Sequence, residues 1–188
     1  LEWIDYERVR IKDWLGYALG YAHGLAEEGK MEEANQEYDI ILKQIQGLEK
    51  RDSLYLEVQL TRAIDLYVAK DDKTALEIAT EILNQSKDQK PKNYLLQSNT
   101  LWLIGECLRQ EERFNEALTY CEENITLLTK YSVDHDGHHL ENILLQHGDI
   151  LLELKNYSLA EQSFIEYLSA LKKREPSQDS DDHTIVIS

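Results

Sequence analysis

The sequence predicts an all-α protein built as a solenoid of about four helical hairpins. Two observations carry this prediction. The 188 residues include only eight glycines and two prolines, which leaves little material for turns between many strands. In addition, one pattern of small residues recurs with a slowly drifting period of 41 to 43 residues. A period of this length is typical of stacked units that bury their apolar faces against one another.

The recurring pattern is clearest between residues 101 and 128. Apolar residues with helical spacing form one stripe before the polar turn at 110–113 and another stripe after it. Gly105 and Ala117 lie twelve residues apart across this turn, where two helices can cross closely only if both residues are small. Glycine inside a helix costs about 1 kcal/mol relative to alanine, so its presence indicates a packing role. The segment therefore predicts a helical hairpin.

The same pair of small residues marks each hairpin in turn. The pairs are Ala22 and Ala34, Ala63 and Ala75, Gly105 and Ala117, and Gly148 and Ala160. The hairpins are expected at about residues 2–48, 52–87, 92–131 and 138–174, within one repeat domain at 1–175.

Each hairpin has its own local signals. The first begins with a long helix at 2–28, whose N-terminal half acts as a cap or belongs to a truncated element, and the chain returns at 31–48. Helices at 52–70 and 73–87 form the second, and Pro91 suits the first turn of the next helix. A polar loop at 132–137 separates the third hairpin from the fourth. Residues 176–188 are acidic and rich in serine, and we expect them to be disordered.

The small residue, the alanine twelve positions later and an aromatic residue four positions after that (Tyr38, Phe164) resemble the tetratricopeptide repeat. The resemblance extends from about Trp14 to Leu171 and implies a right-handed superhelix of repeats. The period is longer than the usual repeat of about 34 residues, and the usual proline after the second helix is missing. Longer helices or longer connections account for the extra length better than a change to HEAT repeats.

Charge and composition exclude several classes of function. The net charge of −16 argues against direct nucleic-acid binding by this region, since phosphates are bound chiefly by clusters of Lys and Arg. No apolar run reaches the 18 residues of a membrane span. Cys107 and Cys121 are expected to be small buried residues rather than a disulfide, which suits a cytoplasmic location. The chain starts at Leu1 rather than Met, so we expect it to be part of a longer protein.

No catalytic motif or cofactor-binding motif is recognisable. The loop DHDGHH at 134–139 contains ligand types that bind divalent metals, but its spacing matches no defined metal site and a solvated loop is the preferred interpretation. We therefore predict a non-enzymatic protein without a cofactor or metal ion, and an enzyme with its site at this loop stays the third alternative.

The concave surface of the solenoid is the predicted site of function. The second alanine of each pair, Ala34, Ala75, Ala117 or Ala160, is the marker alanine of its hairpin. Counting back eighteen, fifteen, eleven and eight residues from each marker alanine gives the positions on each first helix that face this surface. The predicted peptide-binding residues at these positions are Leu60, Tyr67, Asn99, Trp102, Glu106, Arg109, Asn142, Leu145 and Asp149. Such a mixture of apolar anchors and isolated polar groups suits an extended peptide.

Asn99 and Asn142 occupy equivalent positions and are the most specific detail. Asparagine is a mediocre helix former, so two at one repeat position indicate recognition of a peptide backbone, or else a preference for the opening turns of helices. Trp102 has a second interpretation as a core residue. Arg109 and Glu106 can equally form an intrahelical pair worth only about 0.3 kcal/mol if exposed.

Groove asparagines in a long-period repeat are similar to those of the Gram-positive peptide-pheromone receptors, the Rap, PlcR-like and Rgg-like group. The resemblance carries over to Asn99 and Asn142 alone, and it implies that a tetratricopeptide-like domain binds a short signalling peptide and controls an attached domain. The alternative is a protein–protein scaffold or a homodimerisation domain, which predicts a broad apolar patch near Trp3 and Ile4.

Overall fold

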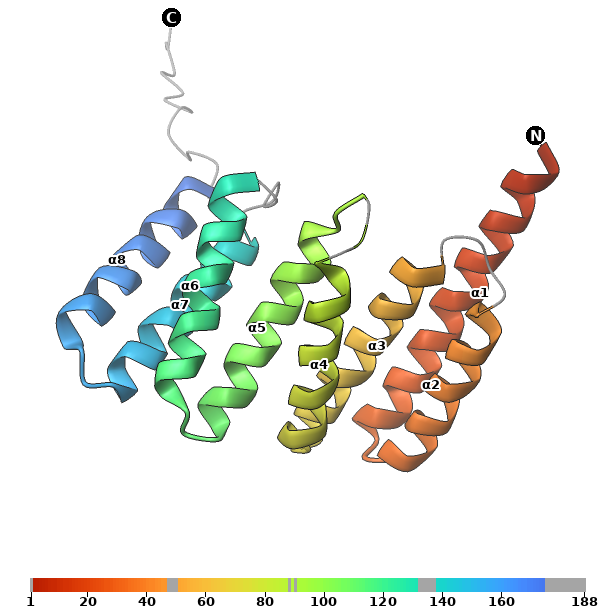
Figure 1. Ribbon diagram of the computed structural model, residues 1–188, viewed down its shortest axis with the longest axis horizontal. Coiled ribbons are helices and arrows are strands. Elements are labelled where there is room, and N and C mark those ends of the chain that lie inside the picture. The colour runs from red at the N-terminus through yellow and green to blue at the C-terminus, as the bar shows by residue number, and fades with distance from the viewer. Residues whose placement is uncertain (1, 47–50, 88, 90, 132–137, 175–188) are drawn as a thin grey trace, which may run out of the picture.

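The computed structural model describes residues 2–46, 51–87, 89, 91–131 and 138–174. This part of the chain forms eight helices and no strand, which confirms the predicted all-α repeat fold. The helices are α1 (Glu2–Glu27), α2 (Met31–Ile45), α3 (Arg51–Val68), α4 (Asp72–Ser86), α5 (Tyr94–Gln110), α6 (Phe114–Tyr131), α7 (His138–Glu153) and α8 (Tyr157–Arg174). Figure 1 shows them side by side in one row from α1 to α8, with the turns inside the hairpins along one edge.

The turn inside each hairpin has the same backbone conformation. The residues Gly29, Lys70, Glu112 and Lys155 have φ angles of 76°, 68°, 60° and 58°, in the left-handed region. The next residue donates its N–H to a carbonyl five positions earlier, as from Lys30 to Leu25 at 2.9 Å, and this bond ends the first helix of the hairpin. Each such residue lies five positions before a marker alanine, so the drifting period of the sequence is the period of these turns.

Three of these four turn positions have a residue other than glycine, which predicts that glycine there increases stability. An L-residue in the left-handed region costs about 1 kcal/mol, a cost that glycine avoids. Lys155→Gly is therefore expected to raise the free energy of unfolding by about 0.5 to 1 kcal/mol, measured by urea denaturation. Lys43→Gly within α2 is the matched control and is expected to lower it by about 1 kcal/mol. A loss of stability in both variants would contradict the argument.

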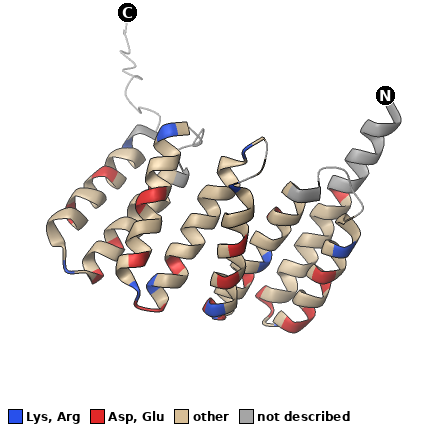
Figure 2. Ribbon diagram, viewed as in Figure 1, with Lys and Arg blue, Asp and Glu red and all other residues tan. Residues whose placement is uncertain are grey.

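The odd-numbered helices form an inner layer. Each of α1, α3 and α5 contacts the next odd-numbered helix, whereas within the described residues no even-numbered helix contacts the next even-numbered one. The odd-numbered helices therefore pack closer to one another than the even-numbered helices do. This difference curves the row, and its concave side is lined by α1, α3, α5 and α7. Acidic side chains occur on helices of both layers (Figure 2).

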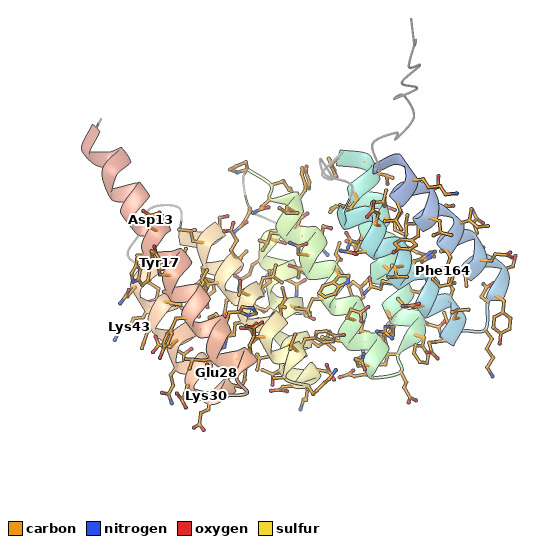
Figure 3. All side chains as sticks on the ribbon, turned by 180° about the vertical axis from the view of Figure 1, so that it is seen from behind. Asp13, Tyr17, Glu28, Lys30, Lys43 and Phe164 are labelled. Atoms are coloured by element: carbon orange, nitrogen blue, oxygen red, sulfur yellow. The ribbon has the colours of Figure 1, made fainter. Side chains whose placement is uncertain are left out.

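The small residues mark close helix crossings, as the pattern indicates. The six alanines of the four pairs have no exposed surface. A methyl group built on Gly148 would lie within 2.8 Å of three ring carbons of Phe164, a residue of α8 that Figure 3 labels. At Gly105, however, the nearest side chain is that of Gln146 on α7, at 2.9 Å from the built position. The nearest neighbour of Gly105 therefore comes from the next hairpin, in addition to the packing expected within its own hairpin.

The apolar core consists of two clusters. One is centred on the first hairpin and includes Tyr38 and Ile41, and the other runs from α3 to α7 through Leu101 and Ile104. Tyr55 on α3 packs against both clusters, so the first hairpin joins the rest of the solenoid through α3. Cys107 and Cys121 are free thiols buried in the second cluster.

The start of α5 differs from the expected one. Pro91 precedes the helix, and Asn93 is the capping residue, whose side-chain oxygen accepts the Leu96 N–H at 3.0 Å. The predicted disordered tail at 176–188 and residues 134–137 of the DHDGHH loop lie outside the described residues, as do the side chains of Trp3, Ile4, His138 and His139. Within the described residues, no helix has the length and apolar character needed to cross a membrane.

Candidate functional site

The predicted peptide-binding residues lie on α3, α5 and α7 of the inner layer, but at different depths. Leu145 and Asn142 are exposed, whereas Asn99, Trp102, Arg109, Tyr67 and Asp149 are half-buried. Leu60 and Glu106 are buried, with 6 % and 8 % of their surface exposed. Leu60 belongs to the core, so we leave it out of the accessible surface. The accessible part is concentrated on α5 and α7, and we call it the inner surface: Asn99, Trp102, Arg109, Asn142, Leu145, Asp149 and Leu152.

Both asparagines of the inner surface present a side chain without a hydrogen-bond partner in the described part of the chain. Asn99 and Asn142 lie in the second turns of α5 and α7, beyond the first turn in which asparagine serves as a cap. The capping role in α5 belongs to Asn93. A preference for helix starts therefore does not explain these two residues, and their carboxamides are able to donate to and accept from a bound group.

Apolar side chains of α7 flank a carboxylate on the inner surface. Leu145 and Leu152 are 38 % and 43 % exposed, and Asp149 lies between them along the helix. Burial raises the pKa of Asp149, the charge of Arg109 opposes this rise, and the charges of Glu106 and Glu153 add to it. Leu152 was missing from the predicted set, although the same counting rule reaches it.

Glu106 connects three helices of the inner layer beneath this surface. Its Oε2 accepts from Arg109 at 2.7 Å and from the Tyr67 hydroxyl at 3.1 Å, and its Oε1 accepts from Gln146 Nε2 at 3.0 Å. The same Gln146 nitrogen also donates to the Trp102 carbonyl at 3.0 Å. The intrahelical pair of Arg109 and Glu106 considered from the sequence is therefore present, as one part of a larger network. This network fixes α3, α5 and α7 relative to one another.

Aromatic packing holds Trp102 against the network. Its ring meets Tyr67 edge to face, with 6.3 Å between the centroids, and it packs against the core. Burial and the nearby Glu106 carboxylate raise the pKa of Tyr67, while the hydrogen bond to Glu106 raises the pKa of Arg109. Trp102 therefore packs partly into the core, as one interpretation predicted, and the rest of its side chain is exposed on the inner surface.

A second polar junction, which the sequence did not reveal, joins the first two hairpins. Asp65 on α3 is 3 % exposed, and it accepts from the Tyr38 hydroxyl of α2 at 2.5 Å. His23 of α1 contacts its other oxygen at 2.7 Å. Tyr38 and His23 lie 27 and 42 residues before Asp65 in the chain, so no local sequence motif predicts these contacts.

The junction at Asp65 predicts a pH dependence of stability. The hydrogen bond to Asp65 and then its charge raise the pKa of His23 above its ordinary value of 6.5, and Glu27 contributes while burial opposes. A raised pKa favours the protonated ring in the folded state, so this stabilisation is complete below about pH 6.5 and is lost as the pH rises through the folded-state pKa. The melting-temperature difference between the parent and His23→Gln is therefore expected to be largest near pH 6 and to shrink toward pH 9. A difference that stays constant over this range would contradict the assignment.

The described residues contain no group of three or more His, Cys, Asp and Glu side chains arranged to hold a metal ion. Burial raises the pKa of Cys107 and of Cys121 to about 12, which keeps both thiols protonated and unreactive at neutral pH.

Comparisons with known proteins agree with this fold. Residues 96–173 match the family model of the tetratricopeptide repeat. No curated protein matches the sequence.

Two solved structures resemble most of this chain in fold. PlcR of Bacillus thuringiensis, crystallised in complex with the peptide PapR7 and DNA, aligns over 90 % of this chain with a TM-score of 0.70 and 14 % identity. BtubC (BKLC) from P. vanneervenii aligns over 85 % of it with a TM-score of 0.57 and 15 % identity. The aligned region spans 62 % of the PlcR chain and 57 % of the BtubC chain. At these identities the likeness concerns the fold, and the chain is an all-α solenoid of tetratricopeptide-like helical repeats.

Proposed function

We propose that the inner surface binds a short peptide in an extended conformation, and that the chain is the sensing or interaction domain of a larger regulatory protein. The observation that carries the proposal is the pair of asparagines without partners at equivalent positions of α5 and α7, next to exposed apolar side chains. A carboxamide can pair with both polar groups of a peptide unit, and Trp102, Leu145 and Leu152 offer contacts for its side chains.

Rigidity of the surface supports the same proposal. The network around Glu106 holds the helices that carry the asparagines, so less conformational freedom is lost when a ligand binds. The resemblance to PlcR, whose crystal contains a bound peptide, favours a peptide as the ligand. We extend the proposal to cytoplasmic peptide signalling of the quorum-sensing type with transcription as the output. A net charge of −16 argues against DNA binding by this region, so the proposal assigns any contact with DNA to another part of such a regulator.

A screen against short-peptide pools tests this proposal by thermal shift and calorimetry. A peptide at a hundred times its dissociation constant is expected to stabilise the domain by about 2.7 kcal/mol. Asn99→Ala and Asn142→Ala are each expected to weaken binding about tenfold, because each removes one hydrogen bond in a partly buried site.

Asn84→Ala on α4 is the matched control, since this exposed asparagine lies on the outer layer. Its affinity for the peptide is expected to equal that of the parent. A peptide that binds all three variants equally well would show that the two asparagines are not part of its binding site.

Exposed apolar residues on α8 favour a second candidate function, which is self-association or scaffolding. Ile165 and Leu168 are 59 % and 52 % exposed at the C-terminal end of the row, one turn apart on the same helix. Sedimentation velocity distinguishes the two functions. Self-association would become the preferred function if the protein is a dimer that Ile165→Glu dissociates, and if no peptide pool changes its melting temperature.

A further inference from the structure

A cavity of about 260 Å³ lies between α3 and α4, away from the inner surface. Tyr55 and Gln59 of α3 form one side, and Glu77, Ile78, Glu81 and Gln85 of α4 are among the residues of the other. The residues of α3 that face the concave side, such as Tyr67, take no part in it. We call this cavity the outer pocket.

The outer pocket offers hydrogen-bond acceptors and no cation. Glu77 and Glu81 lie one turn apart on α4, and no lysine or arginine lines the cavity. Gln59 donates its Nε2 to the Tyr55 hydroxyl at 3.3 Å, while its Oε1 is buried without a hydrogen-bond partner. Gln85 donates to Glu81 Oε1 at 2.6 Å, so the second oxygen of that carboxylate stays available. Each of these amide groups uses one of its two N–H donors in these bonds, and the acceptors that a ligand can reach are the Glu77 carboxylate and the second oxygen of Glu81.

The size and the walls of the pocket narrow the choice of ligand. Small-molecule sites typically have volumes of about 300 to 1,000 Å³, so a cavity of about 260 Å³ suits one long side chain. The Tyr55 ring and Ile78 supply apolar walls for methylene groups, and the carboxylates lie beside them. A basic side chain combines these two requirements, and the net charge of −16 attracts a basic partner. Figure 2 shows acidic residues along α4.

We propose that the outer pocket receives an arginine side chain from a protein partner. A guanidinium group is planar and has five N–H donors, which suits two neighbouring carboxylates better than the compact ammonium group of lysine. Its planar face also packs against an aromatic ring such as that of Tyr55. The pocket lies on the outer layer, so an arginine bound there does not compete with a peptide on the inner surface, and this proposal is independent of the one above.

The test uses three capped tripeptides, Gly-Arg-Gly, Gly-Lys-Gly and Gly-citrulline-Gly, titrated into the isotope-labelled protein and followed by NMR. Citrulline keeps the shape of arginine and lacks its charge. The arginine peptide is expected to shift the side-chain amide signals of Gln59 and Gln85. The citrulline peptide is expected to bind about tenfold more weakly and the lysine peptide several-fold more weakly. Equal affinities for arginine and either analogue would overturn the assignment, as would shifts that leave Gln59 and Gln85 unchanged.

Matched variants separate the outer pocket from general attraction to an acidic protein. The double variant Glu77→Gln with Glu81→Gln is expected to weaken the arginine peptide about tenfold. Glu122→Gln with Glu123→Gln removes the same charge from exposed positions of α6, and its affinity is expected to equal that of the parent. Equal weakening in both double variants would show general electrostatic attraction and refute the pocket.

Discussion

Replacing Gly148 with alanine is expected to lower the free energy of unfolding by about 2 kcal/mol, measured by urea denaturation. The added methyl group would overlap the ring of Phe164, which crosses from α8 and covers this position. The ring or the helix that carries it must therefore shift to admit the methyl group. Gly20→Ala is the matched control, because nothing lies within 4 Å of its built methyl group and alanine favours a helix. That control is expected to gain about 1 kcal/mol.

A double-mutant cycle tests the cause of the Gly148 effect. Phe164→Leu removes the ring atoms that the methyl group would meet, so Gly148→Ala is expected to cost less than about 1 kcal/mol in that background. The same cost in both backgrounds would show that the ring is not responsible.

Replacing Asp65 with alanine is expected to destabilise the protein by about 2 kcal/mol, again by urea denaturation. The change leaves the Tyr38 hydroxyl buried without an acceptor, since Tyr38 has no exposed surface and Asp65 is its partner. It also removes the carboxylate that joins α1 and α2 to α3. Asp39→Ala is the control, because this carboxylate is 67 % exposed and pairs with Arg62 at the surface. We expect it to cost less than about 1 kcal/mol.

The double variant Asp65→Ala with Tyr38→Phe distinguishes an unpaired hydroxyl from other causes. Removing both partners of a buried hydrogen bond costs less than removing one, so the double variant is expected to be more stable than Asp65→Ala alone. Additive losses would contradict this explanation.

Spacing along the chain was enough to predict the repeat fold. The steps between Ala34, Ala75, Ala117 and Ala160 equal the steps between the left-handed turn residues, because one hairpin geometry is repeated four times. The backbone conformation of the turns was not predictable in the same way. Three of those residues are Lys or Glu, and these residue types do not predict a positive φ angle.

Contacts between hairpins were the part that spacing could not predict. Counting back from the marker alanines predicted that the side chains of Glu106 and Leu60 face the concave side. Whether they are buried there depends on Gln146 and other neighbours from adjacent repeats. The partner of Gly105 and the pairing of His23 with Asp65 depend in the same way on the register between repeats. The outer pocket arises from the side-by-side packing of α3 and α4, which residue spacing alone does not determine.

NMR mapping of a peptide from the pool screen tests the central claim most directly. The backbone and side-chain amide signals of the labelled protein are followed as the peptide is added. We expect the largest changes at Asn99 and along α7 from Asn142 to Leu152, with few changes on the outer helices α4 and α6. Changes confined to α8 or to the outer helices, with Asn99 and Asn142 unaffected, would contradict a peptide site on the inner surface.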